Sequence, residues 1–279
     1  MTDDQYEQSL NTHYGRAGLG ERIVSALKAS DKDLAKIVND DLSPVAEFHV
    51  GGQAATLQLA QLAGLGAGMR VLDVGSGLGG PARTLAQHHG CKVTGLDLTE
   101  ELCTVATMLT ELCGMQDDVS FRLGNALDMP FDDASFDLVW TQQACMNIED
   151  KPRLFREAHR VLADGGRLVF QEVLAGQEAP LILPVPWARE AGLSFLLPPE
   201  AIRDVLAEAG FREMIWHDVS AQYLNDHRKL AAITTGPEGP PPLGIHLILG
   251  PEAGQMRRNV VRNLEEKRIV LVQSVLKKN

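Results

Sequence analysis

The sequence of 279 residues carries little positive charge, and its longest apolar runs are short. Its 26 Lys and Arg residues stand against 37 Asp and Glu residues, which gives a formal net charge of −11. A nucleic-acid partner requires a basic surface that neutralises phosphates, so this balance argues against one. A membrane helix requires roughly 20 apolar residues in a row, and no stretch approaches that length. We therefore expect neither a nucleic acid nor a membrane as partner.

Cysteine is also scarce, with four residues in no C-x-x-C pair and no histidine at zinc spacing: Cys91, Cys103, Cys113 and Cys145. This pattern predicts reduced, mostly buried thiols and no metal site. The first ten residues, MTDDQYEQSL, are acidic and polar, unlike a signal or transit peptide. Both features are typical of a cytoplasmic protein.

Residues 1–65 have helical patterns and are expected to form an N-terminal helical cap. Apolar residues at 19, 23, 24 and 27 of the stretch LGERIVSALKAS fall on one helix face. The stretch DKDLAKIVND has a similar pattern and is also expected to be helical. The stretch GGQAATLQLAQLAGL is expected to form an Ala- and Leu-rich helix with glycines at its ends. The remaining residues, 66–279, are expected to form the main domain.

That main domain alternates short apolar runs with helical patterns. Strands are expected at 69–74, 91–97, 119–123, 136–143, 165–174, 212–220 and 268–278. Runs that are apolar on both faces and alternate with helices predict a parallel sheet covered on both sides. The expected fold is a doubly wound α/β domain with seven mostly parallel strands and lid segments at about 175–200 and 221–265. A Pro/Gly-rich linker or loop is expected at 234–254.

The stretch RVLDVGSGLGGPARTLA places four glycines between the first strand and a helix. Gly75, Gly77 and Gly80 fit the pattern G-x-G-x-x-G, in which backbone N–H groups at the helix start face a ligand. Asp73 lies two residues before the first glycine. Asp97 ends the second strand, where a carboxylate can accept hydrogen bonds from ribose hydroxyls. The alternative is that the glycines serve only tight packing of strand against helix.

The two carboxylates indicate the charge of the ligand. A dinucleotide would bring its pyrophosphate against like charge, whereas S-adenosylmethionine (SAM) has an α-ammonium, a sulfonium, a ribose and no phosphate. The loop therefore favours SAM over NAD. Two alternatives stay open: an NAD-dependent oxidoreductase, and a SAM-binding partner protein without catalysis.

The stretch VLDVGSGLGGPARTLA resembles the first motif of class I SAM-dependent methyltransferases, and GLDLTEE resembles the second. The stretch RLGNALDMPFDDASFDLVWTQQACMNIED is similar to their adenine-binding segment and fourth strand, and EAHRVLADGGRLVFQE to their fifth-strand region. The resemblance runs from about residue 45 to 175. Within the class, DLSPVAEFHVGGQAATLQLA looks most like the sarcosine/dimethylglycine type, with quinone and tocopherol methyltransferases as near neighbours.

The resemblance implies a set of cofactor-binding residues in the glycine loop, at the ends of the second and fourth strands, and after the third. They are Asp73, Gly75, Ser76, Gly77, Gly79, Asp97, Leu98, Asn125, Ala126, Leu127 and Gln142. Asn125 stands where many relatives carry aspartate, and its amide oxygen can still accept a hydrogen bond from the adenine amino group.

Three further residues are candidates for catalysis. Methyl transfer from a sulfonium needs mainly alignment and exclusion of water. His49 is a candidate to orient the acceptor or to act as a base, which a phenol or enol would need more than an amine. Tyr14 is a candidate to fold over SAM, and Gln143 to lie near its methionine end. Structural roles are the plainer alternative for His49 and Tyr14.

Residues 181–200 are rich in Leu, Pro, Trp and Phe and are expected to form a wall or lid for a small-molecule acceptor. Trp187 could stack on a ring or hold an ammonium, and Arg189 could clamp a carboxylate. The leading expectation is methylation of an amine or amino acid nitrogen. O- or C-methylation of an aromatic, quinone or other natural product is the alternative. The oligomeric state stays open, with a homodimer as one option.

Overall fold

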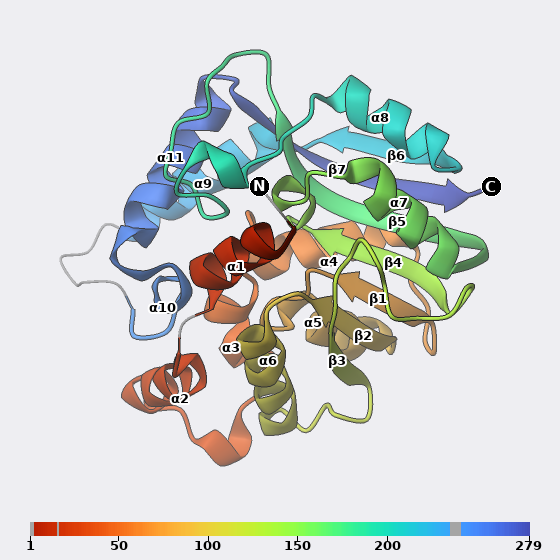
Figure 1. Ribbon diagram of the computed structural model, residues 1–279. Coiled ribbons are helices and arrows are strands. Elements are labelled where there is room, and N and C mark those ends of the chain that lie inside the picture. Colours follow the sequence, from red (N-terminus) through yellow and green to blue (C-terminus); the bar gives the residue numbers. More distant parts are fainter. Residues whose placement is uncertain (1–2, 16, 235–240) are drawn as a thin grey trace.

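A seven-stranded sheet forms the centre of the computed structural model, which describes residues 3–15, 17–234 and 241–279 (Figure 1). The strands are β1 (Arg70–Val74), β2 (Lys92–Asp97), β3 (Val119–Leu123), β4 (Phe136–Gln142), β5 (Leu162–Ala175), β6 (Phe211–Asp218) and β7 (Ile269–Lys278). Their order is β3-β2-β1-β4-β5-β7-β6, and β7 runs antiparallel to both of its neighbours. The expected mostly parallel, doubly wound sheet is confirmed.

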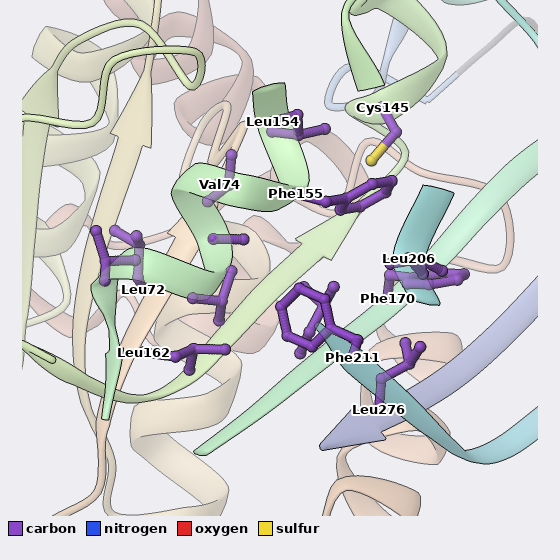
Figure 2. Close-up of a cluster of buried hydrophobic side chains, with 14 of the residues drawn as sticks. Leu72, Val74, Cys145, Leu154, Phe155, Leu162, Phe170, Leu206, Phe211 and Leu276 are labelled. Atoms are coloured by element: carbon purple, nitrogen blue, oxygen red, sulfur yellow. The ribbon is translucent and has the colours of Figure 1, made fainter. Parts of the chain in front are cut away.

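Helices cover both faces of the sheet because neighbouring strand residues point to opposite sides. Val71 packs against α4 (Gly52–Ala63) and α5 (Gly80–His89). Leu72 points the other way, into the cluster formed with α7 (Lys151–Val161) and α8 (Pro199–Glu208). Figure 2 shows part of this second cluster, in which Leu72 and rings such as Phe155 fill the space between the helices and the sheet.

The N-terminal region contributes three more helices, α1 (Asp3–Tyr14), α2 (Leu19–Ala29) and α3 (Asn39–Ala46). Helices α2 and α3 share an apolar cluster with α6 (Glu100–Leu112) and with Leu78 of the glycine loop. Because α4 packs on the sheet itself, the region before residue 65 joins the main domain closely, and a boundary there stays a prediction.

The helical expectation for DKDLAKIVND is wrong. The structure has a single 3-10 turn there, Leu34–Lys36, and α3 begins only at Asn39. The carboxylate of Asp33 accepts a hydrogen bond from the backbone N–H of Ala35 at 3.1 Å. Such local side-chain bonds compete with the helical pattern, and they favour a short turn.

The last third of the chain holds α9 (Ser220–Thr234), α10 (His246–Leu249) and α11 (Ala253–Glu265). Helix α9 was not expected from the sequence. The expected loop at 234–254 needs correction, because α10 and a 3-10 turn, Gly250–Glu252, occupy its second part, while residues 235–240 lie outside the described residues. Of the helices in the described ranges, none has the length and apolar character that a membrane span requires.

Shortening an apolar side chain in the core of the sheet should lower the stability of the fold. Leu72 has an exposed fraction of 0%. We expect Leu72→Ala to lower the free energy of unfolding by about 2–5 kcal/mol, since it removes buried methyl groups and leaves a cavity. Urea denaturation measures the loss. The matched control is Leu123→Ala on β3, where the side chain is 50% exposed and the expected loss is below about 0.5 kcal/mol.

Candidate active site

A cavity of about 1180 Å³, a volume that includes its open mouth, lies at the carboxyl ends of β1, β2 and β4. Val74, Asp97 and Gln142 line it, and each is at or next to the last residue of its strand. The chain leads from β1 to β2 and β3 on one side and from β4 to β5 on the other, so this is the switch point where such sheets bind ligands. Pockets for small molecules and cofactors have volumes of roughly 300–1,000 Å³, so the cavity has the size of a ligand-binding site.

The cavity gathers nearly all of the residues predicted from the sequence. The lining includes Tyr14, His49, Gly75, Ser76, Gly77, Asp97, Leu98, Asn125, Ala126, Leu127, Gln142 and Gln143. Two predicted residues, Asp73 and Gly79, are not among those that line it. Segments as distant in sequence as Tyr14 and Gln143 therefore meet around one space.

The glycines of the loop divide into two kinds. A Cβ on Gly75 would lie 2.3 Å from the Cβ of Ala144, and one on Gly79 would lie 2.3 Å from the ring of Phe121. At Gly77 the backbone is also left-handed, with φ +52°, but a Cβ would meet nothing within 4 Å. Packing thus accounts for Gly75 and Gly79, whereas Gly77 leaves space open at the cavity wall.

Asp97 holds this loop in place. Its Oδ2 accepts a hydrogen bond from the backbone N–H of Gly77 at 2.8 Å, and its Oδ1 accepts one from the N–H of Thr99 at 2.9 Å. Burial raises the pKa of the Asp97 carboxyl, and these N–H groups offset only part of that rise. The carboxylate joins the end of β2 to the loop that follows β1.

Asp73 is buried behind the cavity wall, with an exposed fraction of 1%. Its Oδ2 has no hydrogen-bond partner among the described residues. Burial, followed by the charges of Glu47 and Asp97, raises the pKa of Asp73 to about 8. These three residues, Glu47, Asp73 and Asp97, form an acidic cluster beside the glycine loop. Such a cluster favours a ligand with positive charge.

Glu47 belongs to a buried network that the sequence did not reveal. Its Oε2 lies 2.8 Å from Nε2 of His49 and accepts a hydrogen bond from the hydroxyl of Thr56, while its Oε1 accepts one from Thr84 at 2.6 Å. Burial raises the pKa of Glu47, but the bonds from His49, Thr84 and Thr56 outweigh it and hold the pKa below its usual value. The sequence signal was the acid two residues before the histidine, in EFH.

Gln142 ends β4 beside this network, and Gln143 follows it. The Oε1 of Gln142 accepts a hydrogen bond from Nε1 of Trp140 at 3.0 Å. Gln143 has φ +57°, which is uncommon for a residue with a side chain, and its N–H donates to the carbonyl of Gln171 at 2.9 Å. Its Oε1 accepts from the N–H of Val50, while its Nε2 is buried without a partner among the described residues. Backbone strain of this kind clusters at functional sites.

Asn147 ties together what we call the roof, formed by Tyr14, Asn147 and residues 181–200. The hydroxyl of Tyr14 donates to Oδ1 of Asn147 at 2.8 Å. The Nδ2 of Asn147 donates to the carbonyls of Trp187 and Leu193, each at 2.8 Å. Tyr14, Asn147 and Trp187 all line the cavity, so α1 and the expected wall segment meet over it.

The expected carboxylate clamp is not present. The guanidinium of Arg189 binds Glu252 at 3.0 Å, the carbonyl of Leu249 at 2.9 Å and Nδ1 of His13 at 3.0 Å, and Arg189 does not line the cavity. Its role is to join the roof segment to α1 and to the turn after α10. Within residues 3–15, 17–234 and 241–279, no Lys or Arg lines the cavity, nor does any residue of the expected lid segment 221–265.

Comparison with known proteins places this site in a family. Residues 72–170 match a family model described as a methyltransferase domain. The chain is 32% identical over 186 residues to the sarcosine/dimethylglycine N-methyltransferase of Halorhodospira halochloris, covering 67% of this chain and 66% of the relative. It is 33% identical over 168 residues to the 27-O-demethylrifamycin SV methyltransferase of Amycolatopsis mediterranei (strain S699), covering 59% and 62%. The matches span slightly less than two thirds of both relatives.

A solved structure shows the same fold over nearly the whole chain. The geranyl diphosphate C-methyltransferase from Streptomyces coelicolor A3(2) superposes with a TM-score of 0.71, covers 98% of each chain and is 16% identical. At that identity the likeness concerns the fold alone.

The buried carboxyl of Asp73 should make stability depend on pH. Its pKa rises from 3.8 to about 8, so between these values the folded chain holds a proton that the unfolded chain has released. The contribution of Asp73 to the free energy of unfolding therefore falls as the pH rises through this range. We expect Asp73→Asn to raise the melting temperature more at pH 8 than at pH 5, by several degrees, since 1 kcal/mol corresponds to about 2–4 °C.

Calorimetric melts at pH 5, 6.5 and 8 measure this difference. The matched control is Asp117→Asn, an exposed aspartate outside the cavity, which should show no gain with pH. Equal melting temperatures of Asp73→Asn and the native chain at pH 8 would contradict the charged environment assigned to Asp73.

Proposed function

Because the chain belongs to the class I methyltransferases, with their domain at residues 72–170, we propose that it transfers a methyl group from SAM to a small-molecule acceptor. One observation carries the proposal. Gly77, Asp97 and Asn125 line a single cavity at the switch point of the sheet, beside a cluster of buried carboxylates. This arrangement suits a nucleoside that is positively charged and carries no phosphate.

The residues present fit SAM. The carboxylate of Asp97 is placed to accept hydrogen bonds from the ribose hydroxyls, and Asn125, Ala126 and Leu127 to border the adenine. Gly77 leaves room where a side chain would enter the cavity. Asp73 does not line the cavity, and with a pKa of about 8 it is a buried carboxyl whose ionisation a nearby ammonium or sulfonium would favour. When bound, SAM supplies a methyl carbon activated by its positively charged sulfur.

The remaining part of the cavity is the acceptor side, and its walls are largely apolar. Leu10, Tyr14, Phe48, Met146 and Trp187 line it. Arg189 is engaged elsewhere, and among the described residues no Lys or Arg lines the cavity, so an acceptor with a phosphate or carboxylate would be buried without the counter-charge of such a side chain.

We therefore infer an uncharged, largely apolar acceptor. This places O- or C-methylation of an aromatic or other natural product ahead of N-methylation of an amino acid. The names of relatives span both chemistries, including an N-methyltransferase and a 27-O-demethylrifamycin SV methyltransferase.

Calorimetry of the native chain with S-adenosylhomocysteine (SAH) and, separately, with NADH tests the cofactor. We expect SAH to bind and NADH not to bind. Asp97→Ala should weaken SAH binding by about 1–3 kcal/mol, because it removes a charge-assisted hydrogen-bond acceptor. The exposed Asp117→Ala is the matched control and should bind as the native chain does. NADH binding without SAH binding, or full affinity in Asp97→Ala, would reverse the assignment.

The two kinds of glycine give a second test. Gly77→Ala should fold with a loss of about 1–2 kcal/mol for the left-handed backbone, yet bind SAH at least 10-fold more weakly because the methyl group enters the cavity. Gly75→Ala should lose more stability, since its Cβ would overlap Ala144. Thermal melts and calorimetry together separate the effects. Native affinity for SAH in Gly77→Ala would show that the ligand lies elsewhere.

A further inference from the structure

His49 lines the cavity near the end of β4, and Glu47 supports it from beside the glycine loop. We propose that these two residues form a proton-accepting pair, with His49 as the base and Glu47 as its positioning residue, and that the acceptor therefore presents a hydroxyl group. The inference rests on the proposed methyl transfer and extends it to the accepting atom.

The hydrogen bonds define the roles of the two imidazole nitrogens. Hydrogen bonds hold the pKa of Glu47 below its usual value despite burial, so the carboxylate is ionised and accepts the proton on Nε2 of His49 at 2.8 Å. Nδ1 is then the nitrogen with the free electron pair. Its polar neighbours, Nε2 of Gln142 and the carbonyl of Val50, both lie at 3.4 Å, which is long for a hydrogen bond.

The carboxylate of Glu47 is more deeply buried and more fully hydrogen-bonded than a role in shaping the turn before α4 would require. Its side chain is 1% exposed and that of His49 is 4% exposed, so this carboxylate is removed from water. A buried charge is costly unless it is paired and hydrogen-bonded. Here Thr56 of α4 and Thr84 of α5 donate to its two oxygens, and His49 supplies the third bond. The environment thus stabilises a positive imidazolium on His49.

Two other charged groups interact with this pair. Asp73 on β1 and Arg83 on α5 both interact electrostatically with Glu47. Both are buried, and neither lines the cavity. His49 is therefore the member of this set that can reach an acceptor.

In the transfer step the acceptor oxygen forms a bond to the methyl carbon, the bond from that carbon to sulfur breaks with its electron pair on sulfur, and the hydroxyl proton moves to Nδ1 of His49. Positive charge thereby passes to the imidazolium beside Glu47, which later releases the proton to water. Gln143, whose Nε2 lacks a partner among the described residues, lies alongside as a donor that can orient the oxygen. An amine acceptor would need no such base.

Nuclear magnetic resonance of the intact, ¹⁵N-histidine-labelled chain with SAH bound tests the pair without turnover. We expect a downfield Nε2–H resonance that disappears in His49→Gln, which assigns it, and moves upfield in Glu47→Gln, because a neutral amide accepts more weakly than a carboxylate. Glu21→Gln, an exposed glutamate, is the matched control and should leave the resonance in place. An unchanged resonance in Glu47→Gln would overturn the pairing.

Turnover tests the accepting atom. The probes are a panel of apolar phenols, enols and alcohols, each paired with the amine of the same skeleton, with SAH release as the readout. We expect the hydroxyl compounds to react and His49→Gln to lower their rate by about 100-fold or more at unchanged SAH affinity. Glu47→Gln should lower the rate at least about 10-fold at unchanged SAH affinity, since a neutral amide holds the Nε2–H of His49 more weakly than the carboxylate does.

The outcomes separate this inference from the proposed function. Failure of SAH to bind the native chain would overturn methyl transfer itself. If SAH binds, three results would overturn the role of His49 as the base and leave the cofactor assignment unchanged. They are a reaction with the amine probes, a native rate in His49→Gln, and the lack of any reactive hydroxyl probe.

Discussion

The hydrogen bond from the N–H of Gly77 to the carboxylate of Asp97 is the constraint on which the site depends. It joins the loop after β1 to the end of β2, directly beside the point where the order of the strands reverses. It acts together with the hydrogen bonds from the N–H groups of Gly75 and Ser76 to the carbonyl of Leu96, which also hold the loop over the sheet. The other carboxylate oxygen accepts a hydrogen bond from the N–H of Thr99, so both oxygens of Asp97 are held in place at the edge of the cavity.

A second constraint follows from placing Glu47, Asp73 and Asp97 together in a buried region. Burial, followed by the charges of Glu47 and Asp97, raises the pKa of Asp73 to about 8. At Glu47 the hydrogen bonds from His49, Thr84 and Thr56 outweigh the effect of burial. The uncompensated member, Asp73, lies next to the glycine loop. One electrostatic arrangement thus favours a cation on the cofactor side and an ionised partner for histidine on the acceptor side.

The roof over the cavity depends on a single amide. Asn147 bonds Tyr14 of α1 and two carbonyls of the segment 181–200, so residues more than a hundred positions apart cover the same space. Its inner surface is apolar, and Arg189 holds its outer side against α1 and the turn after α10. The acceptor is therefore selected by shape and by the few polar atoms at the end of β4, because no Lys or Arg in the described lining can attract an anion.

Much of this could be read from the order of residues alone. The alternation of strands and helices, the glycine loop and Asp97 follow from local patterns, because the carboxyl ends of parallel strands must meet at one edge of the sheet. The resemblance to methyltransferases added Asn125. Local patterns did not predict three features of the fold. These are the position of β7 between β5 and β6, the turn in place of a helix at 34–36, and helix α9. The sequence also did not predict several long-range hydrogen bonds, because no local pattern around one residue indicates its partner. These are the bonds of Glu47 to Thr56 and Thr84, of Arg189 to Glu252 and of Asn147 to the roof. Long-range contacts of this kind arise only when packing of the whole chain brings distant polar groups into a space without water, where each of them must find a partner.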